Sequence, residues 1–437
     1  MRKVLIIVHD FPPFGGGAVI RTLKYVKYLK DNGWQPTVLT LKHEYPLVED
    51  KSLLEEIPED IEVIRTPDTK LMQALGKRRQ LSKDNGSEID TSAPSRRYRI
   101  LRFIKNIVVS LIYVPDTQAA WLPIAKQTIS QMDLKDFDII YTTAPPFSIG
   151  LLGLWIKKRH PKIPWVLDLR DAWIGNSQFT ARFFWNRWRC ARMEKRILNN
   201  ADSIITTTKE TTDSYKDRYP NISPKFFHTL TNGFDPADFT NNQAHMRTDK
   251  FVITFIGSMM KEVRDPRPFL EAVIRILDKN PDFAKNLQIN LLGVLDPTNR
   301  ERFDNPKIKP YVTLFGNRPH IEATEALGNT VINLNILTQA SGAERITPGK
   351  IYEYFASQRP ILALTHEGAS ARMTREINAG TVINPTDTDQ IEAELQRLYK
   401  QWKADPDSLL VPAKNIDQYN RKKITSRLAK IFNDLKA

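Results

Sequence analysis

Three consecutive glycines, Gly15 to Gly17, stand between an apolar run and a helical pattern near the start of the chain. Glycine lets a backbone approach a ligand closely, and the first N–H groups of a helix bind anions. Gly16 and Gly17 are therefore candidate phosphate-binding residues, with a simple tight turn as the alternative. The GxGxxG fingerprint of dinucleotide-binding folds is disfavoured, because Ile20 stands where its third glycine belongs. Lys42 stands where the fingerprint expects an acidic residue at the end of the second strand.

A second cluster lies between Thr347 and Glu353, shortly before an apolar run of strand length. Thr347 is expected to cap a helix with Pro348 in its first turn, and Gly349 permits close approach of a ligand. Lys350 adds positive charge for a phosphate, and the Glu353 carboxylate could accept hydrogen bonds from ribose hydroxyls. The alternative is a capped helix with an ordinary surface Lys and Glu.

A third cluster begins at Gly257, at the end of the apolar run 251–257, and continues with Lys261 and Arg264. Groups beyond the carboxyl end of a parallel strand lie where α/β folds bind ligands. These two cations could neutralise a departing diphosphate, and solvated loop charges are the alternative.

Acidic residues form two further groups. Asp168, Arg170 and Asp171 end another expected strand, where they are predicted to bind an acceptor, and Asp171 is the candidate to orient it. A structural Asp–Arg pair is the competing interpretation. Asp387 and Asp389 form an acidic DxD pattern, but they precede a helical pattern, so they are interpreted as a helix cap and no metal site is predicted.

The elements that position these residues follow an α/β rhythm. Apolar runs of strand length occur at 3–9, 37–41, 61–66, 139–143, 165–169, 203–208 and 226–232, and a second series occurs at 251–257, 287–293, 312–316, 331–336 and 361–365. This pattern predicts two doubly wound Rossmann-like domains facing across a cleft. We expect an N-terminal acceptor domain at 1–240 with a flexible insertion at about 70–95, and a donor domain at 250–412. A C-terminal helix at 413–437 is expected to pack back on the first domain.

Charge and composition restrict the partners and the compartment. The net charge of +14 favours polyanions, but the chain has no zinc-ligand spacing or RNA-binding signature, so nucleic acid is not expected. The segment 96–108 has the pattern of a basic amphipathic helix, which indicates an anionic membrane surface, with a solvated helix as the alternative. Its cations are Arg96, Arg97, Arg99, Arg102 and Lys105. Short apolar runs and one cysteine predict a cytoplasmic protein, with peripheral association at the inner face of the cytoplasmic membrane left open.

Seven stretches resemble the retaining GT-B glycosyltransferases of the large family 4, especially bacterial enzymes that build surface polysaccharides. They are 11–34, 141–150, 165–173, 201–208, 230–239, 255–272 and 347–364. The resemblance implies a GT-B fold and transfer of a sugar from a UDP- or GDP-linked donor to a saccharide or lipid-linked acceptor. It also implies retention of anomeric configuration and no required cofactor or metal.

The resemblance also implies roles for matched positions. Gly16 and Gly17 would lie over the donor diphosphate and the acceptor, and Glu353 would bind the ribose. Arg264, Lys261, Gly349 and Lys350 would hold the diphosphate, so that Arg264 and Lys350 are expected to act in catalysis together with Asp171. The first glutamate of the family's paired-glutamate pattern falls on Arg345, and Glu344, one position away, is the candidate donor contact. A sugar-nucleotide epimerase of the same fold and a non-catalytic sugar-nucleotide-binding protein remain alternatives.

Overall fold

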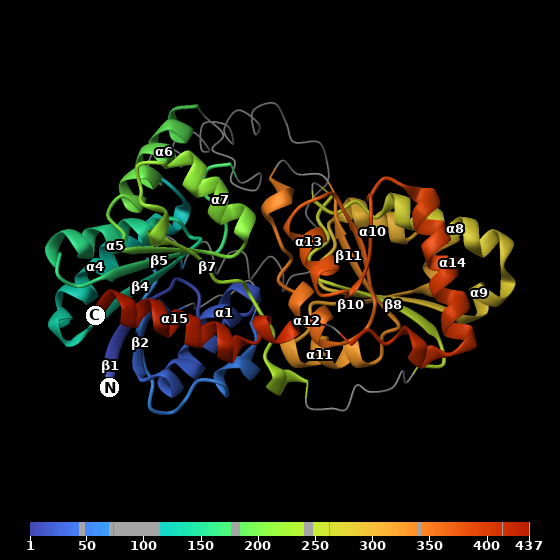
Figure 1. Cartoon of the computed structure of the whole chain (residues 1–437), viewed down its shortest axis with the longest axis horizontal. Helices are drawn as coiled ribbons and strands as arrows, with labels where there is room; N and C mark the ends of the chain where they lie inside the picture. The colour runs from blue at the N-terminus through green and yellow to red at the C-terminus, as the bar shows by residue number, and fades with distance from the viewer. Residues whose placement is uncertain are drawn as a thin grey trace. The chain divides into compact units, whose positions relative to one another are not determined.

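The computed structural model in Figure 1 describes residues 1–42, 49–69, 73, 114–175, 184–239, 248–261, 263–338, 342–412 and 414–436. The chain divides into two compact units. Unit 1 comprises 1–207, 211–230 and 425–437, and unit 2 comprises 208–210 and 231–424. The expected insertion at 70–95 and the basic segment 96–108 fall outside the described residues, apart from Gln73.

Unit 1 is built on a seven-stranded sheet in the order β3-β2-β1-β4-β5-β6-β7. Its strands are β1 (Arg2–Ile7), β2 (Trp34–Leu41), β3 (Glu62–Thr66), β4 (Ile139–Ala144), β5 (Trp165–Leu169), β6 (Ser203–Thr206) and β7 (Phe227–Thr229). Every neighbouring pair is parallel. The central strands β4 and β5 are buried along their whole length, which explains their continuous apolar runs.

Helices complete the βαβ units of unit 1. They are α1 (Gly17–Leu29), α4 (Leu122–Ser130), α5 (Ser148–Arg159), α6 (Phe184–Leu198) and α7 (Lys209–Arg218). Short 3-10 helices occur at Lys30–Asn32, Lys51–Leu54, Thr117–Trp121, Leu134–Asp136 and Pro224–Phe226. The buried side chains of α5 and α6 join those of β4 and β5 in one apolar core, which fixes the carboxyl ends of these strands.

The last helix, α15 (Arg421–Lys436), supplies its residues from Thr425 onward to unit 1. Phe432 is fully buried there, with its ring centroid 5.2 Å from that of Trp34 and 6.1 Å from that of Tyr141. Asn433 accepts a hydrogen bond of 3.0 Å from the Arg2 guanidinium. The end of the chain thereby covers strands from its beginning.

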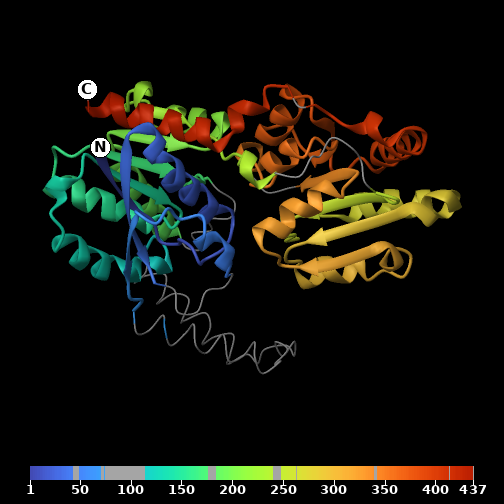
Figure 2. The same ribbon diagram turned by 90° about the horizontal axis from the view of Figure 1, so that it is seen from below.

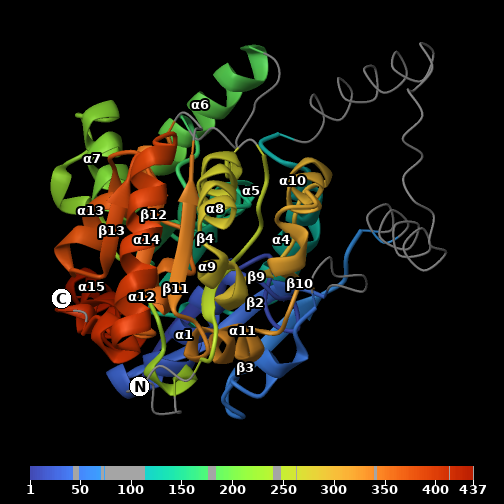
Figure 3. The same cartoon turned by 90° about the vertical axis from the view of Figure 1, so that its right-hand side faces the viewer.

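Unit 2 is built on a six-stranded parallel sheet in the order β10-β9-β8-β11-β12-β13 (Figure 3). Its strands are β8 (Phe251–Ile256), β9 (Leu287–Leu292), β10 (Val312–Gly316), β11 (Ile332–Leu337), β12 (Ile361–Thr365) and β13 (Gly380–Ile383). The sequence did not predict β13. This four-residue edge strand is mostly half-buried, and so short a segment has no clear apolar run.

Helices lie on both faces of this second sheet (Figure 2). They are α8 (Arg267–Lys279), α9 (Pro281–Asn286), α10 (Pro297–Phe303), α11 (His320–Gly328), α12 (Ile351–Ala356), α13 (Ala369–Glu376) and α14 (Thr388–Ala404). Short 3-10 helices occur at Pro236–Asp238, Lys309–Tyr311, Ala343–Arg345, Pro406–Leu409 and Ile416–Tyr419. No helix of the described residues in either unit is long and apolar enough to cross a bilayer.

Candidate active site

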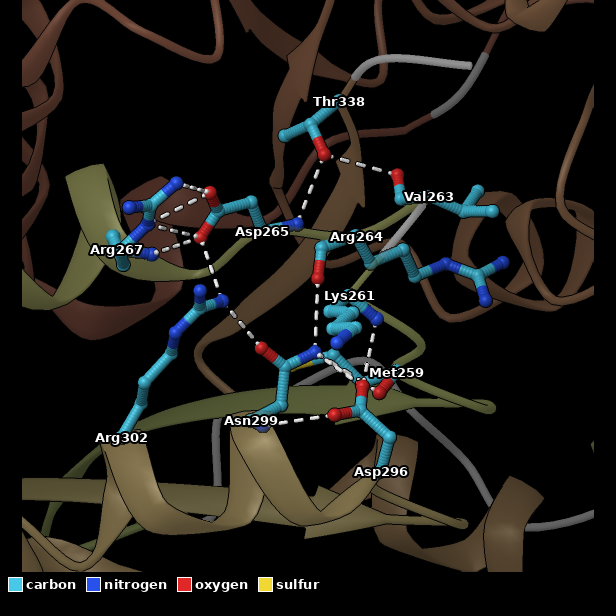
Figure 4. Close-up of polar contacts among 10 residues, drawn as sticks. All are labelled: Met259, Lys261, Val263, Arg264, Asp265, Arg267, Asp296, Asn299, Arg302 and Thr338. Carbon is cyan, nitrogen blue, oxygen red and sulfur yellow. Dashed lines mark hydrogen bonds and ion pairs between the residues drawn. The ribbon is translucent and has the colours of Figure 1, made fainter. Parts of the chain in front are cut away.

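In unit 2 the chain turns sharply where β8 ends. Gly257 has φ of +138°, a conformation that L side chains rarely adopt, and its N–H donates 2.8 Å to the Leu292 carbonyl of β9. The following loop is fixed by Asn299, which is fully buried on α10 and donates 3.0 Å to the Met259 carbonyl and 3.1 Å to the Arg264 carbonyl (Figure 4). The loop that carries the predicted cations is therefore rigidly held.

A second set of polar contacts holds the far side of this loop (Figure 4). The Thr338 hydroxyl donates 3.0 Å to the Val263 carbonyl and accepts 2.9 Å from the Asp265 N–H. Asp265 in turn accepts from Arg302 at 3.0 Å and pairs with Arg267. The Asp265 carboxylate is thus paired with Arg302 and Arg267 and not with Arg264.

Arg264 lies apart from those ion pairs. Its guanidinium extends away from the Asp265 cluster, donates to the Ser258 carbonyl and lies 5.9 Å from the Phe255 ring centroid (Figure 4). No carboxylate of the described residues forms an ion pair with it, and its partial removal from water lowers the pKa of Arg264. A desolvated cation without a neutralising acid is an electrostatically prepared anion site.

Lys261 belongs to the same loop but is more exposed. Its backbone N–H donates 2.6 Å to Asp296, which anchors its main chain, while no described carboxylate pairs with its ammonium. The structure thus brings Gly257, Lys261 and Arg264 together on one loop at the carboxyl end of β8.

Lys350 and Glu353 lie at the beginning of α12. The Lys350 Nζ is 2.7 Å from the Glu353 carboxylate and 3.1 Å from Nδ1 of His320. On its other side, Nε2 of His320 lies 3.1 Å from Asp238. The two ring nitrogens of His320 thus face the Lys350 ammonium on one side and the Asp238 carboxylate on the other.

His320 was not predicted from the sequence. It begins α11, thirty positions from Lys350 in the chain, and is 8% exposed. No local pattern signals its role, because a single histidine at a helix start is common, and only the packing of α11 against α12 brings the two side chains together.

The expected N-cap of α12 was wrong. The helix begins at Ile351 with Lys350 as the residue before it, and the Thr347 hydroxyl lies 3.3 Å from the Tyr352 hydroxyl instead of bonding a helix N–H. The Ile351 N–H bonds the Pro348 carbonyl, so 348–350 form a turn that delays the helix. Gly349 in this turn is exposed.

Glu344 lies on the 3-10 helix Ala343–Arg345, where it is exposed and pairs with Arg345 at 3.2 Å. Its backbone contacts the start of α13 closely, since a Cβ built on Gly368 would lie 2.5 Å from Glu344 Cα. Its carboxylate remains accessible to a ligand from this fixed backbone.

In unit 1, Gly16 precedes α1 with φ of +115°, and no side chain caps this 13-residue helix. Gly16 and Gly17 are exposed, and no atom lies within 4 Å of a Cβ built at either position. The space around both Cβ positions is therefore open, and the start of a helix suits the close approach of an anion.

Asp168 requires a correction. It is fully buried and binds the equally buried Arg21 through two contacts of 2.8 and 3.1 Å. The Tyr141 hydroxyl donates to the same carboxylate at 2.5 Å, and Thr143 donates at 3.3 Å. Since all of these partners are interior groups, Asp168 is not accessible to an acceptor; it joins β4, β5 and α1.

Arg170 is 9% exposed and donates to the Pro145 carbonyl, and its burial lowers the pKa of its guanidinium. Asp171 is exposed, although desolvation raises the pKa of its carboxyl. Of the three residues expected to bind an acceptor, Asp171 alone presents its side chain at the surface.

Asp387 caps α14, as the sequence predicts, by accepting 3.0 Å from the Gln390 N–H. Asp389 lies in the first turn of this helix and pairs with Arg275 at 2.7 Å. The predicted membrane residues Arg96, Arg97, Arg99, Arg102 and Lys105 lie outside the described residues.

Comparison with protein families places both units in one enzyme class. Residues 16–223 match the model of a glycosyl transferase 4-like domain, and residues 250–401 match that of glycosyl transferases group 1. The chain is a glycosyltransferase. The class uses nucleotide-sugar donors, and the predicted fold of two doubly wound Rossmann-like domains is confirmed. A search of curated protein sequences finds no match to this glycosyltransferase.

Solved structures share the GT-B fold of this glycosyltransferase. Sucrose-phosphate synthase from Thermosynechococcus elongatus has 15% identity and a TM-score of 0.61, covering 100% of this chain and 99% of its own. A glycosyltransferase from Rickettsia africae has 14% identity and a TM-score of 0.62, covering 99% and 98%. TarM from S. aureus has 12% identity and a TM-score of 0.61, covering 99% and 100%. At these identities the likeness shows the fold.

Proposed function

We propose that this glycosyltransferase moves a sugar from a UDP- or GDP-linked donor to a saccharide or lipid-linked acceptor in cell-surface polysaccharide biosynthesis. The transfer retains the anomeric configuration and requires no metal. The observation that carries the proposal is Arg264, a desolvated guanidinium that no described carboxylate neutralises. The TarM structure contains UDP and a GlcNAc-glycerol, and an E. coli structure of the same fold contains UDP-2-fluoro glucose, which supports the donor class.

The chemistry depends on the leaving group. When the anomeric C–O bond breaks, negative charge develops on the departing nucleoside diphosphate. Arg264 and Lys261, from the loop after β8, stabilise that charge more in the transition state than in the ground state. Because the loop is held by Asn299 and Thr338, these cations need little rearrangement when the charge appears.

Lys350 adds a second source of charge on the same unit. Its ammonium contacts both Glu353 and His320. Binding of a diphosphate turns Lys350 toward phosphate oxygens, and the Glu353 carboxylate then accepts from ribose hydroxyls. The backbone at Gly349 and Glu344 contribute further donor contacts.

Unit 1 contributes the open start of α1 and the exposed Asp171. The backbone N–H groups at Gly16 and Gly17 bind phosphate or acceptor oxygens, and Asp171 orients the acceptor hydroxyl. We further propose that the enzyme works in the cytoplasm beside an anionic membrane surface, with the cations between Arg96 and Lys105 as contacts.

The decisive test replaces two proposed diphosphate ligands. Arg264→Ala together with Lys350→Ala should lower donor turnover at least about tenfold, equivalent to about 1.4 kcal/mol of lost transition-state stabilisation. The matched control is Lys400→Ala with Lys414→Ala, which removes two exposed cations from the same unit. Unchanged turnover in a folded Arg264/Lys350 variant would reject these roles.

The alternatives give different products. An epimerase converts the nucleotide sugar without an acceptor, and a non-catalytic protein binds the donor in calorimetry without any hydrolysis or transfer. NMR of the transferred sugar reports retention or inversion, and turnover after chelation of divalent ions tests metal independence.

A further inference from the structure

The outward face of α6 in unit 1 combines aromatic and basic side chains. Phe184 is 81% exposed and Trp188, one helical turn later, is 59% exposed. Arg187, Arg192, Lys195 and Arg196 are exposed on the same helix, and Arg192 lies 4.7 Å from the Trp188 ring centroid. Two exposed aromatic rings at i and i+4 differ from the single apolar residues that any surface carries.

The opposite face of α6 is firmly anchored. Cys190, Ile197 and Leu198 belong to the core of unit 1. Glu194, the helix's one acidic residue, is 1% exposed and accepts hydrogen bonds of 3.0 Å from Tyr215 and 2.5 Å from Tyr219. The exposed side therefore carries basic charge alone, on a helix whose orientation is fixed from within.

Within the described part of the chain, acidic side chains do not neutralise the charge on this face. No described carboxylate forms an ion pair with the four exposed cations. A hollow of about 590 Å³ opens along the helix; its lining includes Trp188, Met193 and the cations Arg189, Arg192, Lys195 and Arg196. Phosphate groups fit such a hollow through the guanidinium and ammonium donors.

We propose that α6 is a membrane-contact surface that binds an anionic lipid bilayer. Phe184 and Trp188 lie at the level of the acyl boundary, where aromatic rings are favoured, and Arg187, Arg192, Lys195 and Arg196 bind the lipid phosphates. The pairing of exposed aromatic rings with unneutralised cations on a rigid helix fits a bilayer, because a bilayer offers apolar and anionic layers at the same time. The inference deepens the proposed membrane association, which it requires.

Vesicle sedimentation of the full chain tests the proposal. We expect binding to vesicles of phosphatidylcholine with phosphatidylglycerol, little binding to phosphatidylcholine alone, and weakening with salt. Arg192→Glu with Lys195→Glu should weaken binding to anionic vesicles at least about tenfold. The matched control, Lys400→Glu with Lys430→Glu, changes net charge equally on other helices and should bind like the unmodified chain.

A second pair of variants tests the aromatic contribution. Phe184→Ser with Trp188→Ser should weaken vesicle binding several-fold, and brominated lipids should quench less fluorescence in Trp188→Phe than in the unmodified chain. Donor turnover in solution should be unchanged in all α6 variants, which verifies that they are folded.

The possible failures are distinguishable. If the unmodified chain binds no anionic vesicles, both the membrane association and the role of α6 are rejected. If it binds but the α6 variants bind equally well, α6 alone is rejected. If single-stranded RNA binds as tightly as vesicles and the aromatic variants bind vesicles normally, α6 is a general polyanion site and the proposal is overturned. If the unmodified chain shows no donor turnover, transferase activity is rejected, and the inference about membrane binding by α6 is not affected.

Discussion

Two arginines, one in each unit, show how the same side chain serves different purposes. Arg21 in unit 1 is 1% exposed, and although burial opposes its charge, Asp168 and its neighbours raise the pKa of Arg21 above its ordinary value. Arg264 in unit 2 is half-buried and has no described carboxylate partner, so desolvation lowers its pKa. An arginine buried with its acid is a structural group whose charge is already compensated, whereas an arginine without an acid partner is prepared for an anion that arrives later.

The largest expected effect is on the free energy of unfolding and concerns Arg21, whose charge is paired with Asp168. Asp168→Leu leaves the guanidinium of Arg21 buried without its acid, and should cost about 3–5 kcal/mol of unfolding free energy. Thermal or urea unfolding measures the loss. Arg21→Met combined with Asp168→Leu should recover most of it, because two apolar side chains of similar volume remove the uncompensated charge. A double variant as unstable as the single one would contradict this account.

A second experiment makes Arg264 resemble Arg21. Ser258→Asp places a carboxylate beside the guanidinium, whose Nη1 already donates to the Ser258 carbonyl. Donor turnover should fall at least about tenfold, because the new acid neutralises Arg264 and repels a diphosphate, while stability changes by no more than about 1 kcal/mol. Ser258→Asn, of the same shape without charge, is the control; an equal loss in both would show that shape, not charge, matters.

The start of α1 in unit 1 is proposed to bind an anion through backbone N–H groups. Gly17→Ala adds a methyl group into open space, so stability should stay the same or rise by up to about 1 kcal/mol. Donor turnover should nevertheless fall several-fold if a ligand approaches this backbone. Gly328→Ala on α11, also without atoms within 4 Å of its Cβ, is the matched control and should keep full turnover. Full activity of Gly17→Ala would remove α1 from the site.

The smallest effect concerns the interior of unit 1. Burial raises the pKa of the Cys190 thiol to about 11, and the side chain is 1% exposed. Iodoacetamide at mildly alkaline pH should therefore modify the native chain far more slowly than the chain in urea, as mass spectrometry would show. Equal rates would mean that the interior holding Arg21 and Asp168 opens readily.

The sequence alone determined the α/β rhythm and the family resemblance. Long apolar strands such as β4 and β8 are evident because buried parallel strands need continuous apolar residues. The short edge strand β13 was missed, because four mostly half-buried residues have no such run. The position of Lys261 and Arg264 in the loop after β8 could be predicted, because the end of a strand and the following loop are adjacent in the chain.

Only the tertiary structure decided which charged residues are paired with an opposite charge. Asp168 looked like a site residue because it ends a strand, yet Arg21, 147 positions earlier in the chain, occupies its carboxylate. His320 gained significance only through its contact with Lys350, and α6 showed its basic aromatic face only once Cys190 and Ile197 were seen packed in the core. Local sequence specifies strands and helix ends through short-range propensity, whereas the partner of a charge is set by long-range packing.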